Sequence, residues 1–286
     1  MTRLAIMSDL HIDLNDFGAF ETETLINTLQ ELDVDHLHLA GDISNHFEEF
    51  SLPFVEKLQS FFPVTYNLGN HDMLGMAEAD IQQMDFQLHE IGQKQLLAFH
   101  GWYDYSFYPE VSVDKNLCTK NALWFDRRLN RNLSDPQITQ KVLGQLDDKL
   151  SQLEPQNTIV AMHFVPHEHF TMTHPRFERF NAFLGSQAFH DLFQQHGIQD
   201  VVFGHAHRSY GDVAIDGVTY HSRPLGYRRE WDLTIDFVNK HPDCNPTGTC
   251  NLSKRYNLVK RREDYQAYAQ SMFKEELRKS ITLFDC

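Results

Sequence analysis

Cysteine is scarce in this sequence, and its apolar runs are short. The 286 residues include four cysteines, at positions 118, 244, 250 and 286, which form no Cys-x-x-Cys pair and no dense set. No run approaches the roughly 20 apolar residues of a membrane span, and the apolar run near the N-terminus is too short for a signal peptide. We therefore expect a cytoplasmic protein with reduced thiols and no membrane partner.

Basic residues are also few. There are 25 Lys and Arg against 40 Asp and Glu, which gives a formal net charge of −15. This balance excludes a generally basic surface, so we expect no long nucleic acid as a partner. A small phosphorylated substrate is still compatible, because a bound cation can invert the field locally. The 17 histidines suit a chain that binds such cations.

Hydrophobic residues make up 41% of the chain, which is enough for a core. The segments predicted to be strands, each followed by a polar turn, are 4–8, 37–40, 64–68, 158–162 and 201–203. Segments with helical spacing of apolar residues alternate with several of them. Such alternation predicts a sheet whose strands are joined by crossover connections.

The segment 101–132 is irregular and rich in aromatic residues. We predict a long loop or a small cap there. Two roles are open for Trp102, Tyr103 and Tyr105. They could stack on a base of the substrate, or they could pack as a hydrophobic cap, which is the more common role of aromatic side chains.

The domain organisation is predicted to be simple. A single domain spans residues 1–286, with a cap or insert at 101–155 and a C-terminal extension at 228–286 that packs a strand and a helix on the rest. The sequence shows no internal repeat and no convincing linker, and it gives no indication of the oligomeric state.

Polar residues of the types that bind metals follow five of the predicted strands. The blocks are Asp9-x-His11, Gly41-Asp42, Gly69-Asn70-His71-Asp72, His163 and Gly204-His205-Ala206-His207. Consecutive strand ends in such a sheet open onto a shared crevice, so these ligands can converge. The alternating spacing in the first and last blocks predicts that each pair lies on one side of an extended segment.

The ligand types restrict the metal. Carboxylate, imidazole and amide without thiolate favour Mn, Fe or Zn, and there are too many histidines for a typical Ca or Mg site. Seven candidates exceed the needs of one tetrahedral site, so two ions that share a carboxylate use them better. Any one of these histidines alone would more often be a hydrogen-bonded core residue. Their occurrence together, in order and at strand ends, favours the metal site.

These blocks carry a resemblance to a known family. Read as D-x-H, GD, GNH(D/E), a later H, and GHxH, they resemble the signature of the calcineurin-like metallophosphoesterase superfamily. The resemblance implies an α/β (α+β) fold, a four-layer αββα sandwich of two mixed β-sheets flanked by helices. The protein Ser/Thr phosphatases of the superfamily have GDxxDRG and GNHE. Here Gly41-Asp42-Ile43-Ser44-Asn45 and the GNHD block depart from that pattern, and are more similar to the bacterial phosphodiesterase branch.

The resemblance also implies roles for individual residues. Asp9, His11, Asp42 and His207 would bind the first metal; Asp42, Asn70, His163 and His205 would bind the second, with Asp42 as the bridge. His71 would contact the phosphate and protonate the leaving oxygen. Asp72 would be the acidic partner that orients His71, or else a simple helix or turn cap.

The implied activity is hydrolysis of a small phosphodiester, such as a cyclic nucleotide or a nucleotide derivative, by attack of a metal-bound hydroxide on phosphorus. The alternatives are a phosphomonoesterase or pyrophosphatase with the same core, and a catalytically inactive scaffold. Further residues that could reach a phosphate, although each is more often structural, are His46, His167, Arg176, Arg223 and Arg228.

Overall fold

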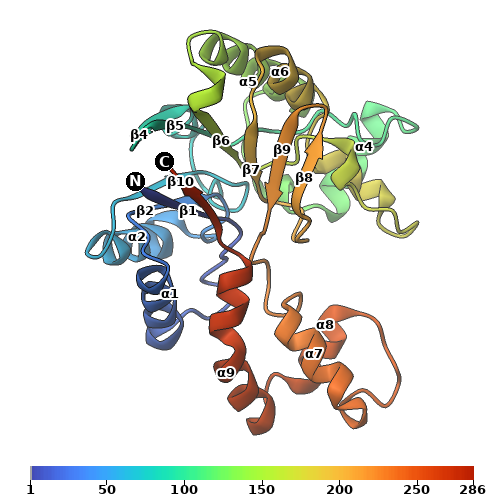
Figure 1. Ribbon diagram of the computed structural model, residues 1–286. Helices are drawn as coiled ribbons and strands as arrows, with labels where there is room; N and C mark the ends of the chain where they lie inside the picture. The colour runs from blue at the N-terminus through green and yellow to red at the C-terminus, as the bar shows by residue number, and fades with distance from the viewer. Residues whose placement is uncertain (1) are drawn as a thin grey trace.

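Two mixed β-sheets form the centre of the protein in the computed structural model, which describes residues 2–286 (Figure 1). The first sheet has the strand order β10 (Thr282–Asp285), β1 (Arg3–Met7), β2 (His36–Ala40), β3 (Val64–Asn67). The second has the order β4 (Gln87–Ile91), β5 (Lys94–Phe99), β6 (Thr158–Met162), β7 (Asp200–Phe203), β9 (Val218–Ser222), β8 (Gly211–Ile215). The inner strands run parallel, and β10, β4 and β8 are antiparallel edge strands.

The alternation of side chains along the strands builds the layers. In β1, Leu4 and Ile6 belong to a cluster between the two sheets, whereas Ala5 and Met7 belong to the cluster that packs against helices. This period of two is what a strand buried on both faces requires. Each sheet therefore has one face toward the other sheet and one face toward helices.

Helices cover both outer faces. The cluster on the first sheet includes residues of α1 (Ala19–Glu31), α2 (Leu52–Gln59) and α9 (Glu263–Lys279), and it continues into α7 (Asp232–Lys240), which packs on α9. The cluster on the second sheet includes residues of α3 (Glu78–Gln83), α5 (Asp135–Leu150) and α6 (Ala188–His196). The predicted αββα sandwich is therefore confirmed. Among the helices of the described chain, none is long and apolar enough to cross a membrane.

The aromatic segment contains helices that its sequence did not predict. They are α4 (Val113–Leu123) and a short 3₁₀ helix, Phe125–Arg128. The reason is physical: the buried positions of α4 are Asn116 and Lys120, so no apolar stripe marks the helix.

The aromatic side chains of this segment pack inside the protein. Trp102 and Tyr103 are fully buried and Tyr105 is 5% exposed, so they are not available to stack on a base. The prediction of a hydrophobic cap is confirmed for them. The carboxylate of Asp135 accepts hydrogen bonds from the indole of Trp102 (3.0 Å), the hydroxyl of Tyr105 and the ammonium of Lys120 (2.6 Å).

Asp135→Ala is expected to destabilise the protein by about 3–5 kcal/mol, because it leaves the nearly buried ammonium of Lys120 without its counter-charge. Denaturation in urea measures the loss. Asp148→Ala is the matched control: Asp148 is an exposed carboxylate of the same helix, and its removal is expected to change stability by at most about 0.5 kcal/mol. Equal stability of the two variants would contradict the role given to Asp135.

The C-terminal region contributes more than the predicted strand and helix. Three helices, α7, α8 (Leu252–Val259) and α9, precede β10. In Figure 1, α7 and α8 project below the sheets as a separate lobe, and α9 leads back to β10, which pairs with β1. The chain therefore returns to its own first strand.

Candidate metal centre

The carboxyl ends of five strands meet at one place and bring all seven predicted ligands together. Asp9 and His11 follow β1, Asp42 follows β2, and Asn70 follows β3 in the first sheet; His163 follows β6, and His205 and His207 follow β7 in the second. Within this set, two groups have potential ligand atoms that all lie within 4.8 Å of one another. They are Asp9, His11, Asp42 and His207, and Asp42, His163 and His205.

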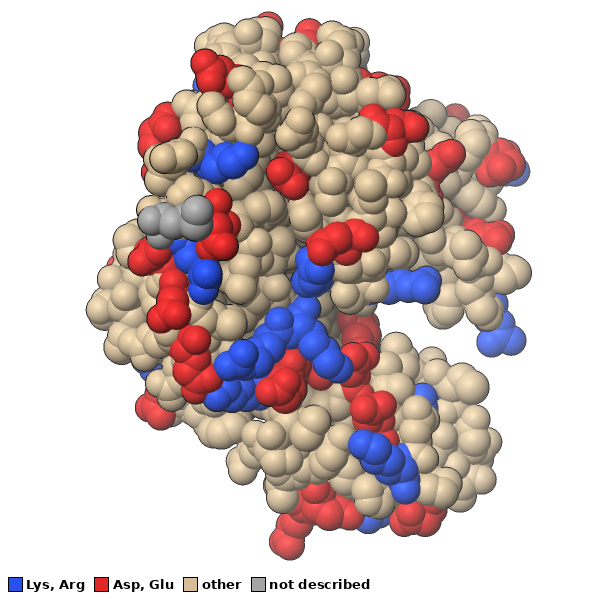
Figure 2. Space-filling view, viewed as in Figure 1, with Lys and Arg blue, Asp and Glu red and all other residues tan. Residues whose placement is uncertain are grey.

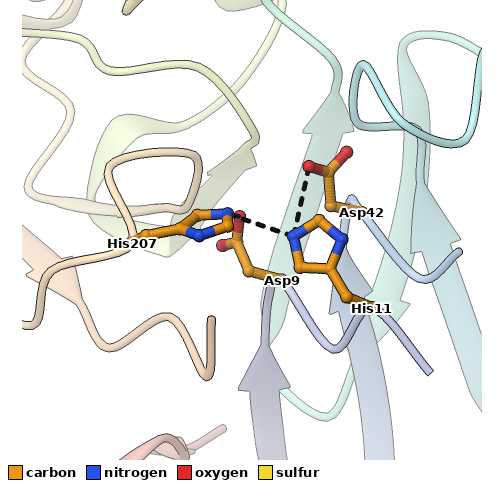
Figure 3. A group of neighbouring side chains, drawn as sticks. All are labelled: Asp9, His11, Asp42 and His207. Carbon is orange, nitrogen blue, oxygen red and sulfur yellow. Dashed lines mark hydrogen bonds and ion pairs between the residues drawn. The ribbon is translucent and has the colours of Figure 1, made fainter. Parts of the chain in front are cut away.

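The first group faces inward (Figure 3). The Nε2 atoms of His11 and His207 are 3.0 Å apart, and the Nε2 of His207 is 3.2 Å from Oδ1 of Asp9. The Nε2 of His11 is also 3.6 Å from Oδ2 of Asp42. Two imidazole nitrogens and two carboxylates thus converge on one point.

The second group shares the same oxygen. Oδ2 of Asp42 is 3.4 Å from Nε2 of His163, which is 3.1 Å from Oδ1 of Asn70. The rings of His163 and His205 are 5.1 Å apart between centroids. Asp42 is therefore the residue common to two adjacent groups.

The contacts among these side chains leave one carboxylate oxygen without a hydrogen bond, which favours a bound cation at this place. Oδ2 of Asp42 is fully buried and has no hydrogen-bond partner among the described residues. A buried carboxylate oxygen without a donor is strongly unfavourable unless a positive charge compensates it. Two adjacent His/Asp clusters with such an oxygen between them suit a dinuclear metal site, and the donor set does not fix the identity of the metals.

Glycines make room for this arrangement. A Cβ atom at Gly69 would lie 2.2 Å from Oδ1 of Asp42, and one at Gly204 would lie 2.4 Å from Oδ2 of Asp9. No larger residue fits at either position while the carboxylates keep their places. The glycines of the GNHD and GHxH blocks are thus needed for close approach.

The backbone of the ligand loops is strained and not extended. Asp9, His11, Asp42, His205 and His207 all have positive φ, between 42° and 65°. The prediction that Asp9-x-His11 and His205-x-His207 are extended pairs is therefore wrong. A non-glycine residue in this region costs about 1–2 kcal/mol, and such strain tends to gather at functional sites. The sharp turns aim successive side chains at the centre.

The electrostatics divide the histidines into two kinds. Burial lowers the pKa of His205 to about 3 and that of His11 well below its ordinary value, so both rings are neutral and able to bind a cation. Burial also acts to lower the pKa of His163, but the adjacent Asp42 carboxylate outweighs it and raises the pKa to about 9. Any cation that binds His163 must displace a proton.

His71 lies at the edge of this centre with its ring held on two sides. Its Nδ1 is 2.7 Å from Oδ1 of Asn45, whose amide nitrogen donates to Oδ2 of Asp13 at 2.8 Å. This orientation of the amide makes Nδ1 the protonated nitrogen and leaves Nε2, 3.9 Å from Oδ2 of Asp42, facing the cluster. The ring of Phe125 stacks on His71 at 3.7 Å and 13°.

The Asp72 carboxylate has a different set of contacts. It accepts four backbone N–H groups, those of Gly69, Asp42, Ile43 and Ser44, at 2.7–3.1 Å. Across the described residues it makes no hydrogen bond to His71. Its contacts favour the turn-cap alternative, because they tie the loop after β2 to the loop after β3.

The hydrogen-bond partners of His71 and of two metal-ligand candidates were not identified from the sequence. Asn45 was the one with a signal, since it occupies the position of the second Asp in the GDxxDRG pattern. The carboxylate of Asp126 accepts a hydrogen bond from Nδ2 of Asn70 at 2.7 Å. The carboxylate of Glu230 lies 2.9 Å from Nδ1 of His207. Neither lies in a block with a recognisable spacing, so only the fold reveals them.

A pocket of about 380 Å³ opens beside His71. Its other lining residues are Leu14, Asn15, Asn45, Phe125, Arg128, Tyr227, Arg228, Arg229 and Tyr256. A larger cavity of about 730 Å³, around Phe47 and Met84, contains none of the predicted ligands. A cavity of about 670 Å³ has the ligand candidate His207 in its lining. Of these three, the pocket at His71 is the one whose lining contains the general-acid candidate.

The fold is similar to those of solved structures. The phosphopantetheinyl hydrolase from Mycobacterium tuberculosis superposes with a TM-score of 0.63 at 19% sequence identity, over 80% of this chain and 91% of that chain. A dimetal phosphatase from Danio rerio gives a TM-score of 0.49 at 15% identity, over 78% of this chain and 87% of that one. No curated protein matches the sequence.

The sequence profile described as Calcineurin-like phosphoesterase matches residues 2–209. That range contains every ligand block from Asp9 to His207. The chain therefore belongs to the calcineurin-like phosphoesterase family of metal-dependent phosphoesterases.

Proposed function

We propose that this protein hydrolyses a small phosphodiester, such as a cyclic nucleotide or a nucleotide derivative. The observation that carries the proposal is the pocket beside His71, which adjoins the two groups of Asp and His side chains. A pocket of about 380 Å³ is in the range of small-molecule sites. It has room for the organic group of a phosphate ester beyond the phosphate itself.

In this proposal the ligands divide as the resemblance implies. Asp9, His11, Asp42 and His207 would hold one cation, and Asp42, Asn70, His163 and His205 the other. Manganese, iron or zinc suits these nitrogen and oxygen donors. When bound, two such ions polarise the phosphoryl oxygens and supply a water of lowered pKa as the nucleophile.

His71 would act on the leaving group. Burial lowers its pKa, so in the resting protein the ring is neutral and has its proton on Nδ1. The negative charge of a phosphate ester close to Nε2 favours protonation there. The proton on Nε2 would then pass to the departing oxygen.

We also propose that the insert at 101–155 and the extension at 228–286 shape this pocket within a single domain. The insert contributes Phe125 and Arg128, and the extension contributes Arg229 and Tyr256. A cytoplasmic location is proposed as well, because all four cysteines are free.

Turnover by the purified protein with Mn²⁺ tests the function. The substrates are bis-p-nitrophenyl phosphate, p-nitrophenyl phosphate, a panel of cyclic nucleotides, and a phosphopantetheinyl ester, which the name of the Mycobacterium tuberculosis protein suggests. A higher kcat/KM for the diesters is the expected result. A preference for p-nitrophenyl phosphate would support the phosphomonoesterase alternative. No turnover with two metals bound would support an inactive scaffold.

A further inference from the structure

The pocket beside His71 is cationic in an otherwise acidic protein. Three arginines, Arg128, Arg228 and Arg229, are among its lining residues, and within the described chain none of those lining residues is Asp or Glu. The net charge of the whole chain is −15. Figure 2 shows the molecule hollowed between the part that carries α4 and the lobe that carries α7 and α8. The basic lining is therefore a local feature.

The three arginines differ in what they already bind. The charge of Arg228 is already compensated within the protein, because its guanidinium forms an ion pair with Glu21 at 2.7 Å. Arg229 contacts Glu230 through Nε at 3.2 Å. Arg128 is exposed and forms no ion pair within the described residues. Arg128 and the outer nitrogens of Arg229 are thus the charges open to a ligand.

Both of these guanidinium groups are positioned by aromatic rings that belong to the centre. The guanidinium of Arg128 lies 4.9 Å from the ring of Phe125, which stacks on His71. The guanidinium of Arg229 lies 3.9 Å from the ring of Tyr227, which stacks on His11 at 4.4 Å. In each case one aromatic ring lies between the guanidinium group and a histidine of the centre. The two arginines belong to different segments of the chain.

We propose that this pocket binds a second phosphate group of the substrate, separate from the phosphodiester that is cleaved. Guanidinium groups match the geometry of phosphate oxygens and bind them through paired hydrogen bonds. The inference rests on the proposed function and narrows it to phosphodiesters that carry a further phosphate. The net charge of −15 on the whole chain disfavours larger polyanions.

A matched set of dinucleotides tests this substrate class. Hydrolysis of diadenosine monophosphate (ApA) is compared with that of the same diester carrying a terminal 5′- or 3′-phosphate (pApA or ApAp). We expect at least one phosphorylated form to have the lower KM. Arg128→Ala and Arg229→Ala are each expected to reduce kcat/KM for that form at least about tenfold more than for ApA, since a charged hydrogen bond contributes about 1.5–3 kcal/mol.

The control is Arg127→Ala, since the guanidinium of Arg127 bonds the carbonyl of Trp124 and does not line the pocket. It is expected to behave as the wild type on all three dinucleotides. If the wild type cleaves bis-p-nitrophenyl phosphate and ApA but gains nothing from the extra phosphate, the subsite is refuted and the phosphodiesterase function stands. If no diester is cleaved, the function itself fails.

A different contact of the same insert supports a second inference. Asp126 is fully buried, and its Oδ1 accepts from Nδ2 of Asn70 at 2.7 Å. Its Oδ2 accepts from the indole of Trp124 at 3.1 Å. A carboxylate can only accept here, so it fixes which end of the Asn70 amide faces it. The oxygen of that amide is consequently turned toward His163, at 3.1 Å from Nε2.

We infer that Asp126 is a positioning residue for the second metal position. Without it, the amide of Asn70 can rotate and present its NH₂ group, which cannot bind a cation. Partners that orient metal ligands typically account for 10–100-fold in metal affinity. The inference rests on the ligand role proposed for Asn70.

Metal content measured by mass spectrometry tests this role apart from activity. Asp126→Ala is expected to retain one metal and to need about 10–100-fold more free metal to fill the second position. Asp126→Asn is the conservative variant: its side-chain oxygen can still accept from Asn70, so we expect much of the affinity to return. A folded Asp126→Ala protein that holds two metals with wild-type affinity would refute the inference. Equal loss in both variants, or loss of the fold in Asp126→Asn, would also refute it.

Discussion

Asp42→Asn is expected to abolish binding of both metals and to reduce turnover at least about 10³-fold, because metal ions contribute several kcal/mol of charge stabilisation in such sites. Oδ2 of Asp42 is the one oxygen common to the two ligand groups, 3.6 Å from Nε2 of His11 and 3.4 Å from Nε2 of His163. The substitution keeps the shape of the side chain and removes its charge. Metal analysis and phosphodiester turnover, measured on the same sample, check both effects.

The fold should survive this change. Oδ2 of Asp42 makes no hydrogen bond within the described residues, while Oδ1 accepts from the backbone N–H of His71, which an amide oxygen can still do. Asp148→Asn, at an exposed position of α5, is the control and is expected to keep full metal content. An Asp42→Asn protein with two bound metals would show that Asp42 does not bridge them.

His71→Ala is expected to keep both metals and to lose about 10²–10⁴-fold in turnover, the usual contribution of a general acid. The reason is its position: Nε2 faces the cluster, 3.9 Å from Oδ2 of Asp42, and is not part of either ligand group. The loss should be greatest for diesters with a poor leaving group, such as an alkoxide, because p-nitrophenolate departs without a proton.

Two measurements separate this role from a structural one. Metal content should stay at two per chain, and the dependence of kcat on the pKa of the leaving group should become steeper than in the wild type. Undiminished turnover of a poor leaving group by His71→Ala would rule out the general-acid assignment. Loss of metal in His71→Ala would instead make His71 a ligand.

The success and the errors of the sequence-based predictions have separate causes. The five strands that carry the ligand blocks were predictable because apolar runs such as Leu4 to Met7 are short and end in polar residues. The division into two sheets was implied only by the family resemblance. Helix α4 was missed because its buried positions are polar. The extended geometry predicted for Asp9-x-His11 was wrong because chain spacing does not report φ, and tertiary contacts hold both residues at positive values.

The sequence by itself determined the seven metal-ligand candidates, because these follow from short-range order: an apolar strand, then a polar block. The fold class of two mixed sheets and the role of His71 came from the family resemblance that these blocks carry. Only the tertiary structure decided which other residues contact and orient these side chains. Asn45 and Phe125 lie against His71, and Asp126 bonds Asn70. Contacts of the last kind join positions that are 56 residues apart. A local sequence pattern cannot predict contacts between residues so far apart in the chain. These contacts depend on how the insert packs on the assembled sandwich.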